Sequence, residues 1–286
     1  MKQIKYIRKA AAPHMVGDGF KVRTFFTSQM WRDLSPFLML DYVEPWELLP
    51  TNHARGVDVH PHKGFETVTI LWEGALAHAD STGATGKLYP GDVQWMTAGS
   101  GILHKEFHEE EFSRKGGVLH NAQLWVNLPA KNKLTPPAYQ DISSSKIPEV
   151  ELPDAKGKIR IIAGELNGVK GAANTFTRIN IFDVDAKADA GFELNVTAGD
   201  NTAIIVAKGT VLIDDHQTAR EGDMIVFEQA GNSIHIQTNN ETHLLLLSGE
   251  PIDEPVASYG PFVMNTQEEI VETIKDFNAG KFGQLN

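Results

Sequence analysis

Two short motifs at the ends of residues 56–106 constrain this chain more than any other feature. The first is His60-Pro-His62 and the second is His104-Lys-Glu106, so each places two potential metal ligands two residues apart. Side chains two residues apart on a β-strand point to the same face, so each motif predicts a strand that carries a pair of ligands. If the two strands face each other inside a barrel, all four side chains converge on one point.

The chemistry of these four side chains suits a metal. Three imidazoles and one carboxylate fit a first-row transition metal such as Fe(II), Mn(II), Ni(II), Cu(II) or Zn(II). Four protein ligands on a metal that prefers six leave open positions, as a catalytic site requires. The order of metal affinities favours copper over iron, so the residue set leaves the identity of the metal open.

The composition excludes several other classes of protein. The 286 residues include no cysteine, which excludes disulfides, thiolate metal sites and cysteine nucleophiles. A formal net charge of −11 without a basic stripe argues against direct nucleic-acid binding. The N-terminus lacks the apolar stretch of a signal peptide, and no apolar run is long enough to span a bilayer. We therefore expect a cytoplasmic protein without membrane contact.

Short apolar runs between turn residues predict an all-β fold in both halves of the chain, of the barrel or sandwich type. The residues from Pro129 to Pro153 contain five prolines and a serine cluster, and this composition predicts a linker between two units. We expect a metal-binding domain over residues 1–134 and a second domain without metal ligands over residues 135–286.

One helix is expected, at the end of the chain. Thr266 and Glu269 are spaced as a capping box, in which each side chain accepts a hydrogen bond from the other residue's free backbone amide. Ile270, Ile274 and Phe277 then form an apolar stripe, and Gly280 follows as a stop signal.

The two halves also resemble each other. Residues 60–74 align without gaps on residues 195–209, and glycine, threonine and isoleucine positions coincide. In this alignment His60 and His62 are replaced by Asn195 and Thr197. We infer two related barrels, with metal chemistry only in the first.

The spacing of glycines and ligands resembles the two cupin motifs, and two such units make a bicupin. The pattern is Gly56…His60-x-His62-x-x-x-Glu66…Gly74, followed by Gly91…Gly99…His104. Longer runs are similar to the pirin family within the cupins: His60-Pro-His-Lys-Gly-Phe-Glu-Thr67, Gly91-Asp-Val-Gln-Trp-Met-Thr-Ala-Gly-Ser-Gly-Ile-Leu-His-Lys-Glu106, Gly249-Glu-Pro-Ile-Asp-Glu-Pro255 and Tyr259-Gly-Pro-Phe-Val-Met-Asn-Thr266. The resemblance covers nearly the whole chain.

This resemblance implies a bicupin fold of two jelly-roll-like β-barrels, and it implies that the metal ligands are His60, His62, His104 and Glu106. It implies a bound iron or another divalent metal (Ni, Mn, Cu or Zn), a monomeric protein, and quercetin 2,3-dioxygenase activity on a flavonol and dioxygen. The alternative that it leaves open is a non-enzymatic, metal- or redox-sensitive regulator that binds a transcription factor or a metabolic enzyme. A cupin isomerase has less support, because nothing indicates a sugar or nucleotide site.

Several other residues are candidates around this site. Glu106, as the only anionic ligand, is a candidate to leave the metal and accept the proton of the flavonol 3-hydroxyl. Glu66 is a candidate to accept a hydrogen bond from a ligand imidazole, or is simply a paired strand carboxylate. Phe65, Gln123 and Trp125 are candidates to line the pocket, although an aromatic residue at such a position is more often part of the core.

If the protein is a regulator, it needs only a surface that changes with the state of the metal. We expect such a surface at the loops around residues 55–58 or 105–115.

Overall fold

The computed structural model describes residues 1–285, which form two compact units. The first unit contains Ala11–Gln29, Leu38–Ser144 and residues 252–285, and the second contains Met1–Ala10, Met30–Phe37 and Ser145–Pro251. Each unit thus takes segments from both sides of residue 134. The boundary between residues 134 and 135 stays a prediction about the sequence.

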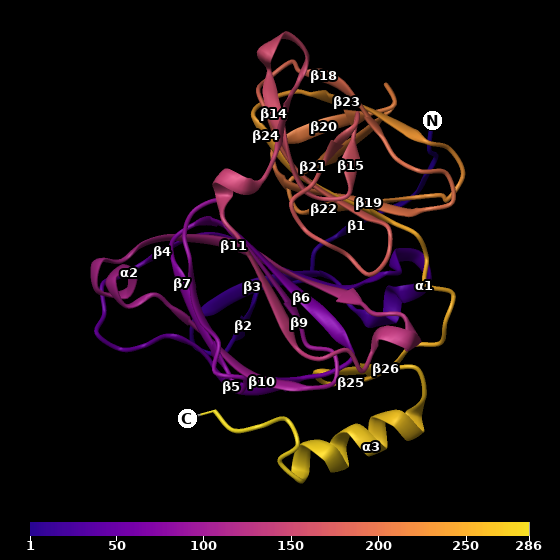
Figure 1. Ribbon diagram of the computed structural model, residues 1–286. Coiled ribbons are helices and arrows are strands. Elements are labelled where there is room, and N and C mark those ends of the chain that lie inside the picture. Colours follow the sequence, from indigo (N-terminus) through magenta and orange to yellow (C-terminus); the bar gives the residue numbers. More distant parts are fainter. Residues whose placement is uncertain (286) are drawn as a thin grey trace. The chain divides into compact units, whose positions relative to one another are not determined.

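The first unit consists mainly of two antiparallel sheets around one interior (Figure 1), in the orders β12-β9-β6-β11-β4-β3-β2 and β5-β10-β7-β8. The larger sheet contains β2 (His14–Val16), β3 (Phe20–Phe26), β4 (Phe37–Leu48), β6 (Phe65–Glu73), β9 (Val93–Thr97), β11 (Gly117–Asn127) and β12 (Ala138–Ile142). The smaller sheet contains β5 (Gly56–His62), β7 (Leu76–Asp80), β8 (Thr85–Leu88) and β10 (Ile102–His108).

Burial along two strands shows how the interior is built. Seven consecutive residues of β6 are buried, so both faces of this strand are covered. In β10 buried residues alternate with half-buried ones, so its interior face consists of Ile102, His104, Glu106 and His108. A strand with period-2 burial therefore directs two of the predicted ligands inward.

The second unit repeats this plan with an apolar interior. Its sheets have the orders β1-β22-β19-β24-β17-β14-β13 and β18-β23-β20-β21, with a β15-β16 hairpin. Its strands are β1 (Ile4–Lys9), β13 (Glu149–Glu151), β14 (Gly157–Ala163), β15 (Glu165–Leu166), β16 (Val169–Lys170), β17 (Ile179–Ala186), β18 (Gly191–Asn195), β19 (Asn201–Lys208), β20 (Thr210–Ile213), β21 (Gln217–Arg220), β22 (Asp223–Phe227), β23 (Ser233–Thr238) and β24 (Thr242–Gly249).

The β18 segment explains why this second interior differs from the first. Leu194 and Val196 are buried in the apolar core of the unit, whereas Asn195 and Thr197 are exposed. The two residues that align with the histidine pair thus point away from the core. Among residues 1–285, the histidine cluster that could hold a metal lies in the first unit.

The predicted linker from Pro129 to Pro153 contains the passage between the two units, which falls between Ser144 and Ser145, and it also carries two short strands. Within this segment β12 pairs with β9 of the first unit, and β13 pairs with β14 of the second. Both are edge strands, and the prolines lie outside them, so no ladder hydrogen bond is lost to proline. The prolines and serines correctly indicated the irregular residues on either side of these strands, but composition did not reveal the short strands themselves.

The C-terminal helix is confirmed as α3 (Gln267–Asn278). The Thr266 hydroxyl accepts a hydrogen bond from the Glu269 amide at 3.2 Å, and the Glu269 carboxylate accepts one from the Thr266 amide at 3.0 Å. In Figure 1, α3 lies beside the hairpin of β25 (Ala257–Tyr259) and β26 (Phe262–Met264) in the first unit. The all-β prediction with a terminal helix therefore holds.

The other helical elements are short: α1 (Trp31–Leu34), α2 (Glu110–Lys115) and the 3₁₀ turns η1 (Ser28–Met30), η2 (Ala130–Asn132), η3 (Ser144–Lys146) and η4 (Pro153–Ala155). None of the helices in the described part of the chain has the length and apolar character needed to cross a membrane.

Candidate metal centre

Three histidines of the first unit meet at the pairing of β5 with β10. His104 lies directly opposite His60 in this antiparallel ladder, and His62 lies opposite Ile102. The ring centroids are 4.2 Å apart for His60 and His104, 4.8 Å for His62 and His104, and 4.9 Å for His60 and His62. One nitrogen from each ring lies within 4.8 Å of the others. These two strands therefore bring three ligand atoms to one point.

The hydrogen bonding of the rings fits a metal site. The Asp58 carbonyl can only accept, so the contact of 2.7 Å makes His60 Nδ1 the donor and directs the other ring nitrogen, Nε2, to any metal ligation. The rings of His62 and His104 are buried, and neither makes a hydrogen bond of ordinary geometry within residues 1–285. Buried polar atoms without partners are uncommon, and a metal ion would give these nitrogens a partner.

The protonation of these rings points the same way. Burial is the main cause that holds the pKa of His62 and of His104 well below the usual histidine value, and the neighbouring imidazoles lower it further. Both rings are therefore neutral at physiological pH, which is the form of histidine that binds metals.

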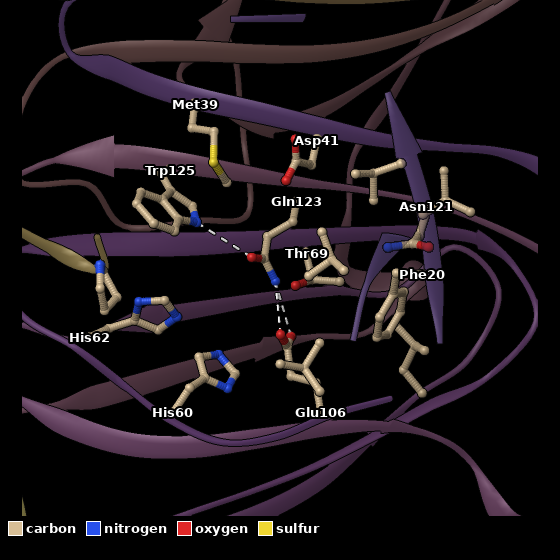
Figure 2. Close-up of a pocket in the computed structure, with 16 residues that line it drawn as sticks. Phe20, Met39, Asp41, His60, His62, Thr69, Glu106, Asn121, Gln123 and Trp125 are labelled. Carbon is tan, nitrogen blue, oxygen red and sulfur yellow. Dashed lines mark hydrogen bonds between the residues drawn. The ribbon is translucent and has the colours of Figure 1, made fainter. Parts of the chain in front are cut away.

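Glu106 lies on the same interior face but apart from the three nitrogens. A bulge in β5 sets Glu106 opposite Val57, while His104 is opposite His60. The Gln123 amide donates to both carboxylate oxygens of Glu106, at 3.2 and 3.0 Å (Figure 2). The structure thus brings together three of the four predicted ligands, and Glu106 as the fourth stays a prediction.

A cavity of about 240 Å³ opens beside this cluster. Its polar residues include His60, His62 and Glu106 (Figure 2). The complete lining is Val16, Phe20, Val22, Met39, Asp41, Val43, Val57, His60, His62, Thr69, Leu76, Glu106, Asn121, Gln123, Trp125 and Pro261. A mostly apolar wall with a few polar groups is typical of small-molecule sites, although this cavity is slightly below their usual ~300–1,000 Å³.

The other predicted pocket residues take different positions. Gln123 and Trp125 line the cavity from one face of β11, and the Trp125 indole donates weakly to Gln123 at 3.4 Å. Phe65 is fully buried and packs against Trp125 and His62, with ring centroids 4.3 and 5.1 Å away. Phe65 therefore supports the cavity wall from behind.

Glu66 is buried and hydrogen-bonded away from the ligand rings. The Thr97 hydroxyl donates to its carboxyl group at 2.7 Å. Burial raises the pKa of Glu66 to about 7. Its role as acceptor for a ligand imidazole stays a prediction, since the hydrogen bond in the structure goes to Thr97.

Sequence reasoning missed three polar residues of the cavity, Asp41, Thr69 and Asn121. Asn121 precedes Gln123 and Trp125 by the same two-residue step on β11, so that alternation could have identified it. Asp41 is a charged residue within an apolar run of β4, and this break in the pattern could have identified it as a candidate.

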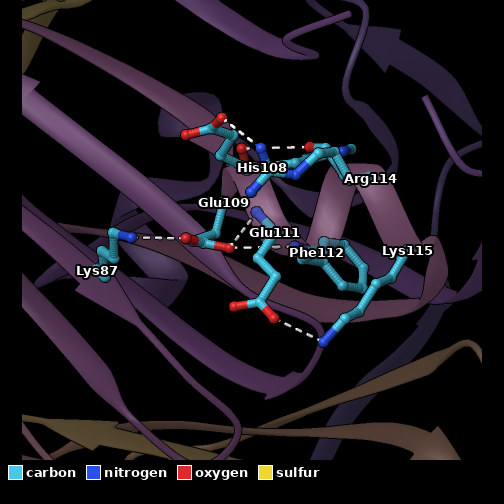
Figure 3. A network of polar contacts seen from close by, with 9 residues as sticks. Lys87, His108, Glu109, Glu111, Phe112, Arg114 and Lys115 are labelled. Carbon is cyan, nitrogen blue, oxygen red and sulfur yellow. Dashed lines mark hydrogen bonds and ion pairs between the residues drawn. The ribbon is translucent and has the colours of Figure 1, made fainter. Parts of the chain in front are cut away.

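The segment expected to be a loop around residues 105–115 is ordered secondary structure, formed by β10 and α2. The Glu109 carboxylate caps α2 by accepting hydrogen bonds from the Glu111 and Phe112 amides, and Lys87 pairs with it at 2.6 Å (Figure 3). Next to it, the buried His108 ring contacts the Gly19 carbonyl at 2.8 Å and packs edge-on against Phe20. This network fixes the segment beside a cavity-lining phenylalanine.

Comparisons with known proteins agree with this geometry. The family model described as Pirin matches residues 19–126, and the model described as Pirin C-terminal cupin domain matches residues 181–283. A Pseudomonas aeruginosa protein, provisionally named as a quercetin 2,3-dioxygenase, is 46% identical over 99% of both chains. The predicted bicupin architecture is therefore confirmed.

Two solved structures are also similar. A crystal structure titled quercetin 2,3-dioxygenase from Acinetobacter baumannii matches with a TM-score of 0.98 and 42% identity, and the match covers 100% of both chains. A bacterial pirin from Escherichia coli, solved in complex with nickel(II), shares the fold with a TM-score of 0.63 and 22% identity, over 86% of this chain and 99% of that one.

Proposed function

Because the chain belongs to the pirin family, we propose that it is a metal-dependent dioxygenase that opens quercetin-like flavonols in the first unit. The proposed metal ligands are His60, His62, His104 and Glu106. The net reaction adds both atoms of dioxygen to the flavonol, opens its central ring and releases carbon monoxide. The names of the relatives refer to a dioxygenase of quercetin, and we propose that this chain acts on the same class of substrate.

The observation that carries this proposal is the position of the histidine cluster in the wall of an apolar cavity. Neutral imidazoles at one edge can hold a divalent metal, while the rest of the wall suits a flat aromatic molecule. We propose a single ion with Fe(II) first, and Ni, Mn, Cu or Zn as alternatives. The nickel in the E. coli relative supports a divalent ion at this kind of site.

A bound metal of this kind would lower the pKa of a coordinated hydroxyl group and so activate the flavonol. The chain's own residues do the rest. Glu106 lies at the same cavity edge and is the proposed acceptor of the 3-hydroxyl proton. Gln123 donates to both oxygens of Glu106 and so holds this carboxylate in place. The apolar wall excludes water from the activated ring.

The test is oxygen consumption by metal-free protein reloaded with each of the five ions. Quercetin loss, oxygen uptake and carbon monoxide release in a ratio of one to one to one with at least one ion would support the proposal. His120→Gln is the matched control for the loss of a cluster histidine, as in His62→Ala. His120 is a buried imidazole of the same unit that contacts Tyr42 at 2.8 Å and lies outside the cluster. No uptake with any ion would overturn the proposal and favour a regulator.

A further inference from the structure

Asp41 is a carboxyl group on an otherwise apolar wall of the cavity. It lies on β4 between Met39 and Val43, and all three side chains line the cavity. Positions two apart on a strand share a face, so β4 presents an apolar, an acidic and an apolar residue to the same space. Nothing in a purely structural wall requires an acid at the middle position.

The contacts of Asp41 leave half of its carboxyl group unused. Thr24 lies directly opposite on β3, and its hydroxyl donates to Asp41 Oδ1 at 2.5 Å. The second oxygen has no hydrogen-bond partner among residues 1–285. Burial raises the pKa of Asp41 above its ordinary value, against the lowering by Thr24 and by His14. Asp41 is half-buried in the cavity wall, so its second oxygen is available to accept a hydrogen bond from a molecule bound there.

A second polar group faces the same space. Asn121 is 4% exposed, lines the cavity from β11, and its Oδ1 also has no partner in the described chain. The amide of Gln123, in contrast, is already engaged by Glu106 and Trp125. Asp41 and Asn121 therefore each present to the cavity an acceptor oxygen that no residue of the described chain uses.

These groups lie away from the histidine cluster. Figure 2 shows His60 and Glu106 at one side of the cavity and Asp41 at the opposite side, with Gln123 between them. A flat substrate that reaches the cluster with one end thus brings its other end toward Asp41. A phenolic hydroxyl at that end would donate to the free oxygen, and an unsubstituted ring would leave the oxygen unpaired.

We propose that Asp41 is a specificity residue that accepts a hydrogen bond from a ring hydroxyl at the end of the substrate away from the histidine cluster. This inference rests on the proposed function and refines it. The preferred substrate class is aromatic molecules with a hydroxyl at each end, and flavonols whose outer rings lack hydroxyl groups are disfavoured.

The experiment compares quercetin with 3-hydroxyflavone, which has only the hydroxyl at the reacting ring. For the metal-loaded wild type, we expect kcat/KM to be about 10- to 100-fold higher for quercetin than for 3-hydroxyflavone. This ratio corresponds to one hydrogen bond to a charged group. Asp41→Leu brings this ratio close to one, mainly through KM for quercetin. Asp41→Asn keeps a carbonyl acceptor of the same size and restores most of the ratio.

Met39→Leu is the matched control, because Met39 lies on the same face of β4 and lines the same cavity without a hydrogen-bonding group. It is expected to leave the ratio unchanged. A wild type that consumes both flavonols with equal kcat/KM, or an Asp41→Leu variant that keeps the wild-type ratio, would overturn the inference and leave the proposed function standing.

If neither flavonol is consumed, the proposed function fails, and binding then decides the inference separately. Tryptophan fluorescence is titrated with each flavonol under nitrogen, with Trp125 in the cavity wall as a reporter. Quercetin binding that weakens about 10-fold or more in Asp41→Leu supports Asp41 as the anchor of an aromatic ligand. Equal binding by wild type and variant refutes it.

Discussion

The carboxyl group of Glu66 gives a prediction whose size follows from the structure. Burial raises its pKa from 4.5 to about 7, so the folded protein keeps this proton over a pH range in which the unfolded chain has lost it. In that range the unfolded state binds fewer protons, and the free energy of unfolding falls as pH rises. A shift of this size at ~1.4 kcal/mol per pH unit amounts to ~3 kcal/mol.

Glu66→Gln removes this titration and keeps an oxygen that can accept from Thr97. The variant should therefore gain ~3 kcal/mol relative to wild type between pH 4.5 and pH 8, with most of the gain between pH 5 and pH 7. Any constant effect of the amide cancels, because the comparison is between two pH values. The assay is urea unfolding of metal-free wild type and variant at pH 5, 6, 7 and 8.

Glu47→Gln, an exposed carboxylate on β4, is the matched control and should show no such gain. If the stability difference between Glu66→Gln and wild type is the same at all four pH values, the argument from burial is refuted. The preference for Glu106 as the proposed fourth ligand rests on position: Glu106 lines the cavity with His60 and His62, whereas Glu66 is hydrogen-bonded to Thr97 outside the cavity lining.

Three further predictions concern the site and the last helix. Glu106→Gln should raise the dissociation constant of the metal at least ~10-fold, measured by competition with a chelator; an unchanged constant together with full turnover would exclude Glu106 as ligand and proton acceptor. Gln123→Met keeps the length of the side chain and removes both hydrogen bonds to Glu106, so it should weaken metal binding or lower kcat about 10- to 100-fold. Wild-type values for both quantities would show that the Gln123 amide does not position Glu106. Thr266→Ala should cost about 1 kcal/mol of helix stability, visible as faster hydrogen exchange in the first turn of α3, and unchanged exchange there would contradict the capping assignment.

Local chemistry explains what the sequence could predict. The capping box depends only on Thr266 and Glu269, which are three residues apart, so the start of α3 was readable directly. The two-residue spacing of the histidine motifs likewise predicted which side chains share a face, and the β5–β10 register then brought His60 opposite His104. Period-2 alternation carries this information without any knowledge of the fold.

Features that depend on distant segments could not be predicted. The bulge that offsets Glu106 from the three histidines arises from the pairing of two strands, and neither strand shows it alone. The cavity position of Asp41 depends on which face of β4 turns inward. Within the Pro129–Pro153 segment, β12 is stabilised by β9, which lies far earlier in the chain, and composition could not indicate that partner.

The most direct test of the central claim is metal content measured together with quercetin consumption under air, for wild type and His62→Ala. His62 is buried and its ring makes no hydrogen bond of ordinary geometry within residues 1–285, so its removal should affect the metal before anything else. The account predicts about one metal ion per chain and metal-dependent loss of flavonol absorbance, both abolished in the variant. A full complement of metal without turnover under any ion, or turnover that survives in His62→Ala, would contradict it.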